Sequence, residues 1–159
     1  MDSPPKADPA MYRKLRDHML RSKQPGFKPD AVQAVFMDWN VSRGTATVVA
    51  AADGSASIYL SSGGGFIGGG EKYPAIRNAA LHAVQIATSL FPQFKSIETI
   101  DLPPAGDVFF YLKTDDEVHL AVAKETNLQA GTDPLLALRA MMQEIVTQYR
   151  LNSPPLSNK

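Results

Sequence analysis

Three runs in the first half of the chain carry apolar, aromatic or β-branched residues typical of β-strands, and the third also alternates apolar with polar residues. The runs are residues 35–41, 45–51 and 55–62. In the last run, Ala56, Ile58 and Leu60 fall on one face and polar residues on the other. Asp53-Gly54 separates the second and third runs and predicts a tight type I′ hairpin turn, because such a turn needs positive φ angles. We therefore expect an antiparallel sheet with one face covered and the other exposed to water.

Three further segments carry apolar residues at the spacing of an α-helix. Asp8-Pro9 and Asp133-Pro134 each combine an N-cap residue with a proline suited to the first helical turn. The first helix is expected to dock on the core through a stripe made of Met11, Leu15, Met19 and Leu20. The central helix, near residues 74–90, is rich in alanine, which allows close approach to the sheet or to a symmetry mate.

A second group of strands follows the central helix. The runs are 97–102, 108–113 and 118–124, with a hairpin turn at Asp115-Asp116 and a loop at 127–132. The predicted order is α-βββ-α-(β)ββ-α, an α+β domain with a mostly antiparallel sheet of five to six strands and helices packed on it. Residues 8–152 form the single domain of this prediction, between flexible tails at 1–7 and 153–159.

The composition narrows the classes of function. The chain has 159 residues, of which 44% are hydrophobic and 20% charged, as in ordinary globular domains. The absence of cysteine excludes disulfides, thiolate catalysis and cysteine-ligated metals. No segment resembles a signal peptide or a membrane span, so a cytoplasmic location is expected.

The net charge is zero, but the charges are distributed unevenly. Residues 1–30 carry seven Lys and Arg against four acids, and residues 96–131 carry seven acids against two lysines. A nucleic-acid-binding protein would show a dominant basic face, which this pattern does not provide. The asymmetry leaves open self-association between the basic and the acidic regions.

The glycine-rich run at 63–70 is the main candidate for a binding loop. It matches G-x-G-x-x-G, but the strand before it belongs to an antiparallel meander rather than to a βαβ unit, and Glu71 would oppose a phosphate. We interpret the run as a mobile loop, or as an apolar tip that docks into a partner or closes over a pocket. The candidate residues for partner or ligand binding are Gly65, Phe66, Ile67 and Gly68.

No catalytic or metal-binding constellation is evident. His18, His82 and His119 lack partners at metal-ligand spacing, so no metal or other cofactor is expected. We expect His82 on a helix surface and His119 on the exposed face of the sheet. Asp38 lies in an apolar strand, and the preferred interpretation is that it faces solvent. If it is buried instead, it needs hydrogen bonds or a positive partner and becomes a candidate site residue.

The order of the predicted elements over roughly residues 30–150 resembles that of the roadblock family and its longin and profilin-like relatives. The best local matches are residues 50–58, which precede the alanine-rich helix, and 116–124, followed by a loop containing Gly131 and a final amphipathic helix. The resemblance implies a non-enzymatic, homodimeric platform that regulates small GTPases, motors or secretion machinery. The glycine-rich run and Pro103-Pro104 depart from the family pattern, so no residue roles are transferred.

Three functions from different classes are compatible with these residues. The favoured one is a dimeric protein-interaction module, with a small GTPase among the candidate partners. The alternative is a small-ligand-binding or sensor domain that uses the glycine-rich run as a lid. The third is an enzyme that uses Asp38 and a histidine brought together by folding.

Overall fold

The structure is a computed structural model, and it describes residues 9–22, 31–42, 44–66, 69–115 and 117–152. Its helices are α1 (Pro9–Arg21), α2 (Pro74–Ser89), α3 (Glu125–Ala130) and α4 (Leu136–Asn152), with a 3₁₀ turn η1 at Phe91–Gln93. Its strands are β1 (Ala34–Val41), β2 (Gly44–Ala51), β3 (Ala56–Leu60), β4 (Gly65–Phe66), β5 (Lys95–Ile97), β6 (Asp107–Lys113) and β7 (Val118–Lys124). The α+β class is confirmed.

All seven strands form one antiparallel sheet in the order β4-β3-β2-β1-β6-β7-β5. The predicted sheet had five to six strands. The first three strands form the expected meander, and β6 returns to pair with β1 at the centre. β4 and β5 are short edge strands, which limits the unpaired backbone that the sheet presents to other chains.

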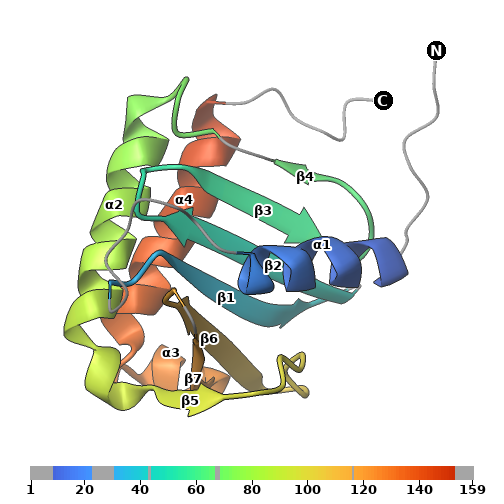
Figure 1. Ribbon diagram of the computed structural model, residues 1–159, viewed down its shortest axis with the longest axis vertical. Coiled ribbons are helices and arrows are strands. Elements are labelled where there is room, and N and C mark those ends of the chain that lie inside the picture. Colours follow the sequence, from blue (N-terminus) through green and yellow to red (C-terminus); the bar gives the residue numbers. More distant parts are fainter. Residues whose placement is uncertain (1–8, 23–30, 43, 67–68, 116, 153–159) are drawn as a thin grey trace.

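Helices α2 and α4 pack side by side on one face of the sheet (Figure 1). The buried alanines of α2 are Ala79, Ala80, Ala83 and Ala87, and all belong to the core on this face. They pack with Val35, Met37 and Phe110 of the sheet. Close packing inside the chain thus accounts for the alanine-rich helix, and no symmetry mate is needed to explain it.

The opposite face is not exposed to water, contrary to the sequence-based expectation. Helix α1 lies across it, on the other side of the sheet from α2 and α4 (Figure 1). A second core forms here, in which Tyr12 and Leu20 of α1 pack with Phe36, Val49 and Tyr111 of the sheet. Both faces are therefore covered, and the sheet is the middle layer of three.

The buried stripe of α1 is rotated by one residue from the predicted one. Tyr12, Arg16 and Leu20 are buried, whereas Met11 and Leu15 are 50% and 43% exposed. Of the predicted stripe, Leu20 is buried as expected and Met19 packs partly against the core, but the prediction was wrong for Met11 and Leu15. An arginine occupies the centre of the buried face, and the periodicity of apolar residues does not identify an arginine as a core residue.

Other local differences concern turns and strand ends. In the turn between β2 and β3, Gly54 alone has a positive φ, 91°, so a three-residue loop replaces the expected type I′ turn. The strand predicted at 97–102 is β5, at Lys95–Ile97, and the helix α3 occupies part of the predicted loop at 127–132.

In the described part of the chain, no helix is long and apolar enough to cross a membrane. The predicted tails at 1–7 and 153–159 lie outside the described residues.

Candidate functional site

A buried ion pair fixes α1 to the centre of the sheet. Arg16 of α1 and Asp38 of β1 are both completely buried. The guanidinium donates from Nε and Nη2 to Oδ2 of Asp38, at 2.8 and 2.6 Å. Its other donors reach the backbone oxygens of Ile100 and Asp101, at 3.0 Å each, and the carboxylate of Asp17 at 2.6 Å. These five hydrogen bonds match the five N–H groups of the side chain.

Two hydroxyl groups complete the network on the carboxylate side. Thr47 of β2 donates to Oδ1 of Asp38 at 2.6 Å. Because that bond uses the only hydroxyl proton of Thr47, the Tyr12 hydroxyl must donate to Thr47, at 2.5 Å. The network therefore runs from α1 through β1 to β2 and back to α1.

Burial and pairing act on this network in opposite directions. Burial raises the pKa of Asp38, against the opposing effects of Arg16 and Thr47. Burial alone would lower the pKa of Arg16, but the Asp38 carboxylate raises it overall. A raised carboxyl pKa would weaken the pair, whereas a raised arginine pKa strengthens it. The three hydrogen bonds that Asp38 accepts favour the ionised carboxylate.

The role of Asp38 follows from its partners. The preferred expectation, that Asp38 faces solvent, was wrong, and the alternative of a buried aspartate with a positive partner is confirmed. Both of its oxygens are engaged by the chain's own side chains. We therefore assign it the role of anchoring α1, rather than acid–base chemistry on a substrate.

The histidines do not form a cluster with one another. His82 is exposed on α2 as expected, and His18 is exposed on α1. His119 was expected on an exposed face, but it is buried, with its ring 4.8 Å from that of Phe91. His119 shares its strand face with Ala121 and Ala123 of the core under α2 and α4, whereas Val118 and Leu120 pack on the α1 side. The error therefore differs from that for Asp38, because the two faces of β7 were assigned the wrong way round. Among the described residues, no group of three His, Asp or Glu side chains is placed to hold a metal ion.

Two of the four candidate loop residues lie in strand β4. Gly65 and Phe66 pair with Tyr59 and Ile58 of β3, and the half-buried Phe66 ring stacks on Tyr149 of α4 with centroids 4.7 Å apart. Ile67 and Gly68 lie outside the described residues. The proposed role of these four residues in partner or ligand binding stays a prediction.

The glycines that follow this strand allow close backbone packing. A Cβ atom on Gly69 would lie 2.4 Å from the hydroxyl oxygen of Tyr149, and one on Gly70 would lie 2.0 Å from the backbone oxygen of Gly54. The Tyr149 hydroxyl accepts from the Gly69 amide at 2.7 Å and donates to the Ala56 carbonyl at 2.5 Å. Close approach therefore explains these two glycines without a nucleotide.

Removing the hydroxyl that holds this region is expected to destabilise the fold. Tyr149→Phe removes both hydrogen bonds of the hydroxyl and leaves only the 3.2 Å bond from the Gly69 amide to the Ala56 carbonyl. The loss of two buried hydrogen bonds should lower the free energy of unfolding by about 1–3 kcal/mol. Urea denaturation monitored by circular dichroism measures the change. Tyr73→Phe, at a half-buried tyrosine directly before α2, is the matched control. Equal stability of the two variants would contradict the assigned role of the Tyr149 hydroxyl.

The outer side of α1 displays apolar and basic side chains together. Met11 and Leu15 lie one turn apart and are both about half exposed, beside the exposed Lys14 and Arg21. The apolar spacing in the sequence placed Met11 and Leu15 in the core, so this surface was missed. Two features of the sequence could have indicated this surface. Tyr12, Arg16 and Leu20 have the same four-residue spacing as the predicted stripe, and Asp38 lies in an otherwise apolar strand that offers it no partner.

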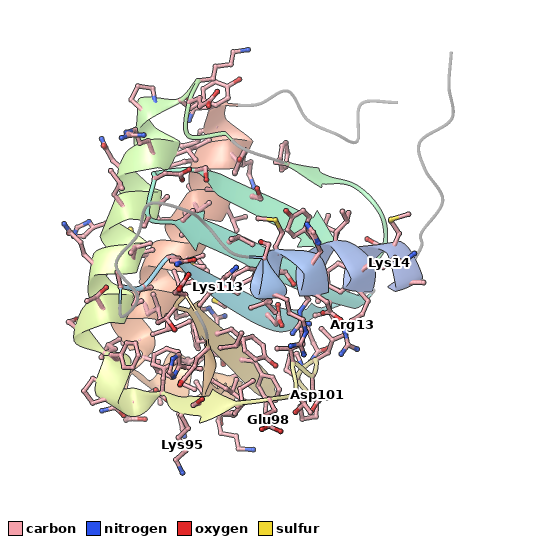
Figure 2. All side chains as sticks on the ribbon, viewed as in Figure 1. Arg13, Lys14, Lys95, Glu98, Asp101 and Lys113 are labelled. Carbon is pink, nitrogen blue, oxygen red and sulfur yellow. The ribbon has the colours of Figure 1, made fainter. Side chains whose placement is uncertain are left out.

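An acidic segment, residues 98–101, lies against the same helix. Arg13 and Arg21 of α1 donate to the backbone oxygens of Ile100 and Glu98, at 3.1 and 3.2 Å. The side chains of Glu98 and Asp101 are exposed, and Figure 2 shows them beside β5, on the side of the molecule that carries α1. We call α1 residues Met11, Lys14, Leu15 and Arg21 together with Glu98 and Asp101 the α1 surface.

Comparisons with protein-family models, curated proteins and solved structures found no match to the chain.

Proposed function

We propose that this chain is a non-enzymatic protein-interaction module of the roadblock-like type that acts as a homodimer. The observation that carries the proposal is the outward display of Met11 and Leu15 on a helix whose inner side is fixed by the buried Arg16–Asp38 pair. An apolar pair on a firmly held helix gives a preorganised contact, which loses little conformational entropy when it binds.

The charges of the α1 surface favour a second copy of the same chain. A two-fold interface uses the same patch on both subunits, so the patch must be complementary to itself. Direct contact of two α1 helices would bring Lys14 and Arg21 near their own copies. The neighbouring Glu98 and Asp101 remove this conflict, because α1 of one copy can lie against the acidic segment of the other.

The contacts of Asp38 and His119, the two residues considered as catalytic candidates, support binding rather than catalysis. Asp38 is held by Arg16 and Thr47, and His119 packs against an aromatic ring. Neither side chain lines the cavities beside Gln33, Thr114 or Arg139. A small GTPase as the partner of the dimer remains part of the proposal through the family resemblance.

Sedimentation velocity of the wild type and of a double variant tests the homodimer. We expect the wild type to sediment as a dimer at micromolar concentration and Met11→Asp/Leu15→Asp to sediment as a folded monomer, because two carboxylates cannot be buried at such an interface without partners. Leu151→Asp is the matched control, since Leu151 is 72% exposed and lies on α4, on the other side of the sheet.

The control separates loss of the interface from a general loss of apolar surface. Leu151→Asp should remain dimeric. A monomeric wild type, or dissociation of the Leu151 variant to the same degree as the α1 variant, would contradict the proposal. Raising the salt concentration should weaken the wild-type dimer, because screening reduces attraction between exposed charges.

A further inference from the structure

A cavity on the α1 side of the sheet is lined by two buried polar side chains that lack partners. It has a volume of about 60 Å³ and lies between Met19 of α1, the ends of β1 and β6, and the β2–β3 hairpin. Its apolar wall includes Ala34, Phe36 and Val49. Gln33, directly before β1, and Lys113, the last residue of β6, supply polar groups to it.

The polar atoms of these two side chains are buried without hydrogen bonds. Gln33 is 1% exposed and Lys113 is 3% exposed. Among the described residues, neither Nε2 nor Oε1 of Gln33 has a hydrogen-bond partner, and neither does Nζ of Lys113. Native structures rarely leave such groups unpaired, because each one costs the free energy of its lost hydration.

Backbone hydrogen bonds hold Gln33 and Lys113 next to each other at the end of the sheet. The Gln33 amide donates to the Lys113 carbonyl at 2.7 Å, and the Gln33 carbonyl accepts from Ala52 at 2.9 Å. The next residue, Ala34, pairs with both Lys113 and Ala51. The ammonium and the amide are therefore carried by adjoining strands at one end of the central sheet, where a single small molecule can reach both.

We propose that this cavity binds a small carboxylate that carries a neighbouring hydroxyl or amino group. The ammonium of Lys113 pairs with the carboxylate, and Nε2 of Gln33 donates to its second oxygen. Oε1 of Gln33 then accepts from the hydroxyl or amino group of the ligand. A ligand of this class meets all three unpaired atoms at once, whereas a simple anion leaves Oε1 without a donor.

The volume limits the size of the ligand. One water molecule occupies roughly 10–15 Å³ of such a cavity, so about 60 Å³ holds roughly four to six non-hydrogen atoms. Glycolate and lactate fall in this range. The apolar wall suits a short carbon chain. The small volume excludes larger anions such as nucleotides.

The surrounding charges are compatible with an anion. Asp53 also lines the cavity, and one oxygen of its carboxylate accepts two hydrogen bonds from Ser55. Arg77 donates to the backbone oxygen of Asp53 at 2.8 Å. Burial lowers the pKa of Lys113 against the opposing effect of Asp115. A bound carboxylate would reverse that shift by supplying the missing counter-charge. Lys113 lies near the end of α1 that leads away from the N-terminus (Figure 2).

Titration calorimetry with glycolate and acetate tests the site. We expect glycolate to bind and acetate to bind more weakly. Lys113→Met should lower the affinity for glycolate at least about tenfold, because it removes a charged hydrogen bond. Gln33→Met should abolish the preference for glycolate over acetate. Lys124→Met is the matched control and should bind like the wild type, since Lys124 is exposed on β7 and pairs with Asp107.

Thermal unfolding without ligand gives a second readout. Because the polar atoms are unpaired in the free protein, Gln33→Met and Lys113→Met should raise the melting temperature. Lack of glycolate binding by the wild type would overturn the proposal, as would equal binding by wild type and Lys113→Met. A melting temperature lowered by both substitutions would instead show a structural role and also overturn it. The result is independent of the oligomeric state.

Discussion

Arg16→Met is expected to lower the free energy of unfolding by about 3–5 kcal/mol, because it leaves the completely buried Asp38 carboxylate without its positive partner. Thr47 supplies a single hydrogen bond to the remaining carboxylate, which cannot replace a counter-charge. The loss also frees the backbone oxygens of Ile100 and Asp101 from Arg16. Urea denaturation monitored by circular dichroism measures the change.

The double variant Arg16→Met/Asp38→Leu distinguishes a charge effect from a packing effect. Replacing a buried ion pair by apolar residues of similar size is often neutral or stabilising, so the double variant should recover most of the loss. Arg13→Met is the surface control, because Arg13 pairs with Asp17 at partly exposed positions and should cost about 1 kcal/mol or less. A double variant that is as unstable as Arg16→Met would contradict the assigned ion pair.

The second large effect is a loss of stability at alkaline pH. Burial raises the pKa of both Tyr12 and Tyr111 from 10.0 to about 12. An unfolded tyrosine releases its proton near pH 10, whereas the folded protein retains it to about pH 12. Stability from these groups is therefore complete below pH 10 and is lost as the pH rises through 12. The expected loss is roughly 2–3 kcal/mol for each tyrosine.

Two spectroscopic measurements test the alkaline prediction together. Phenolate absorbance should show tyrosines that ionise late and together with the loss of the circular dichroism signal of the fold. Tyr12→Phe should shift the unfolding transition to higher pH, because one of the two ionising groups is removed. If all tyrosines ionise near pH 10 while the fold persists, the assigned burial of Tyr12 and Tyr111 is wrong.

Local patterns predicted most elements, but not the side of the sheet that α1 covers. The alternation of Ala56, Ile58 and Leu60 placed β3 correctly, and the alanine pattern placed α2. The second covered face depends on Arg16 meeting Asp38 across 22 positions of sequence. No local pattern encodes such a contact, because each residue taken alone is typical of a surface. The feature of the sequence that indicated such a contact was the charged Asp38 among apolar neighbours in its strand.

The glycine-rich run shows a different limit of sequence reasoning. Gly65 takes part in strand β4, yet a run of glycines carries no apolar alternation from which a strand can be predicted. The requirement for Gly70 comes from its approach to the backbone of Gly54, a contact between distant positions. Likewise, the cavity at Gln33 and Lys113 arises where three strands end together, and neither residue forms a motif in the sequence.

Hydroxyl-radical footprinting of Met11 at increasing protein concentration tests the α1 surface as the interface of the homodimer. Met11 is half exposed in the single chain, and its thioether oxidises readily when accessible. The proposed dimer predicts that oxidation of Met11 falls as the chain associates, while oxidation of the exposed Leu151 stays constant. Oxidation of Met11 that is unchanged at concentrations where sedimentation shows a dimer would place the interface elsewhere and contradict the proposal.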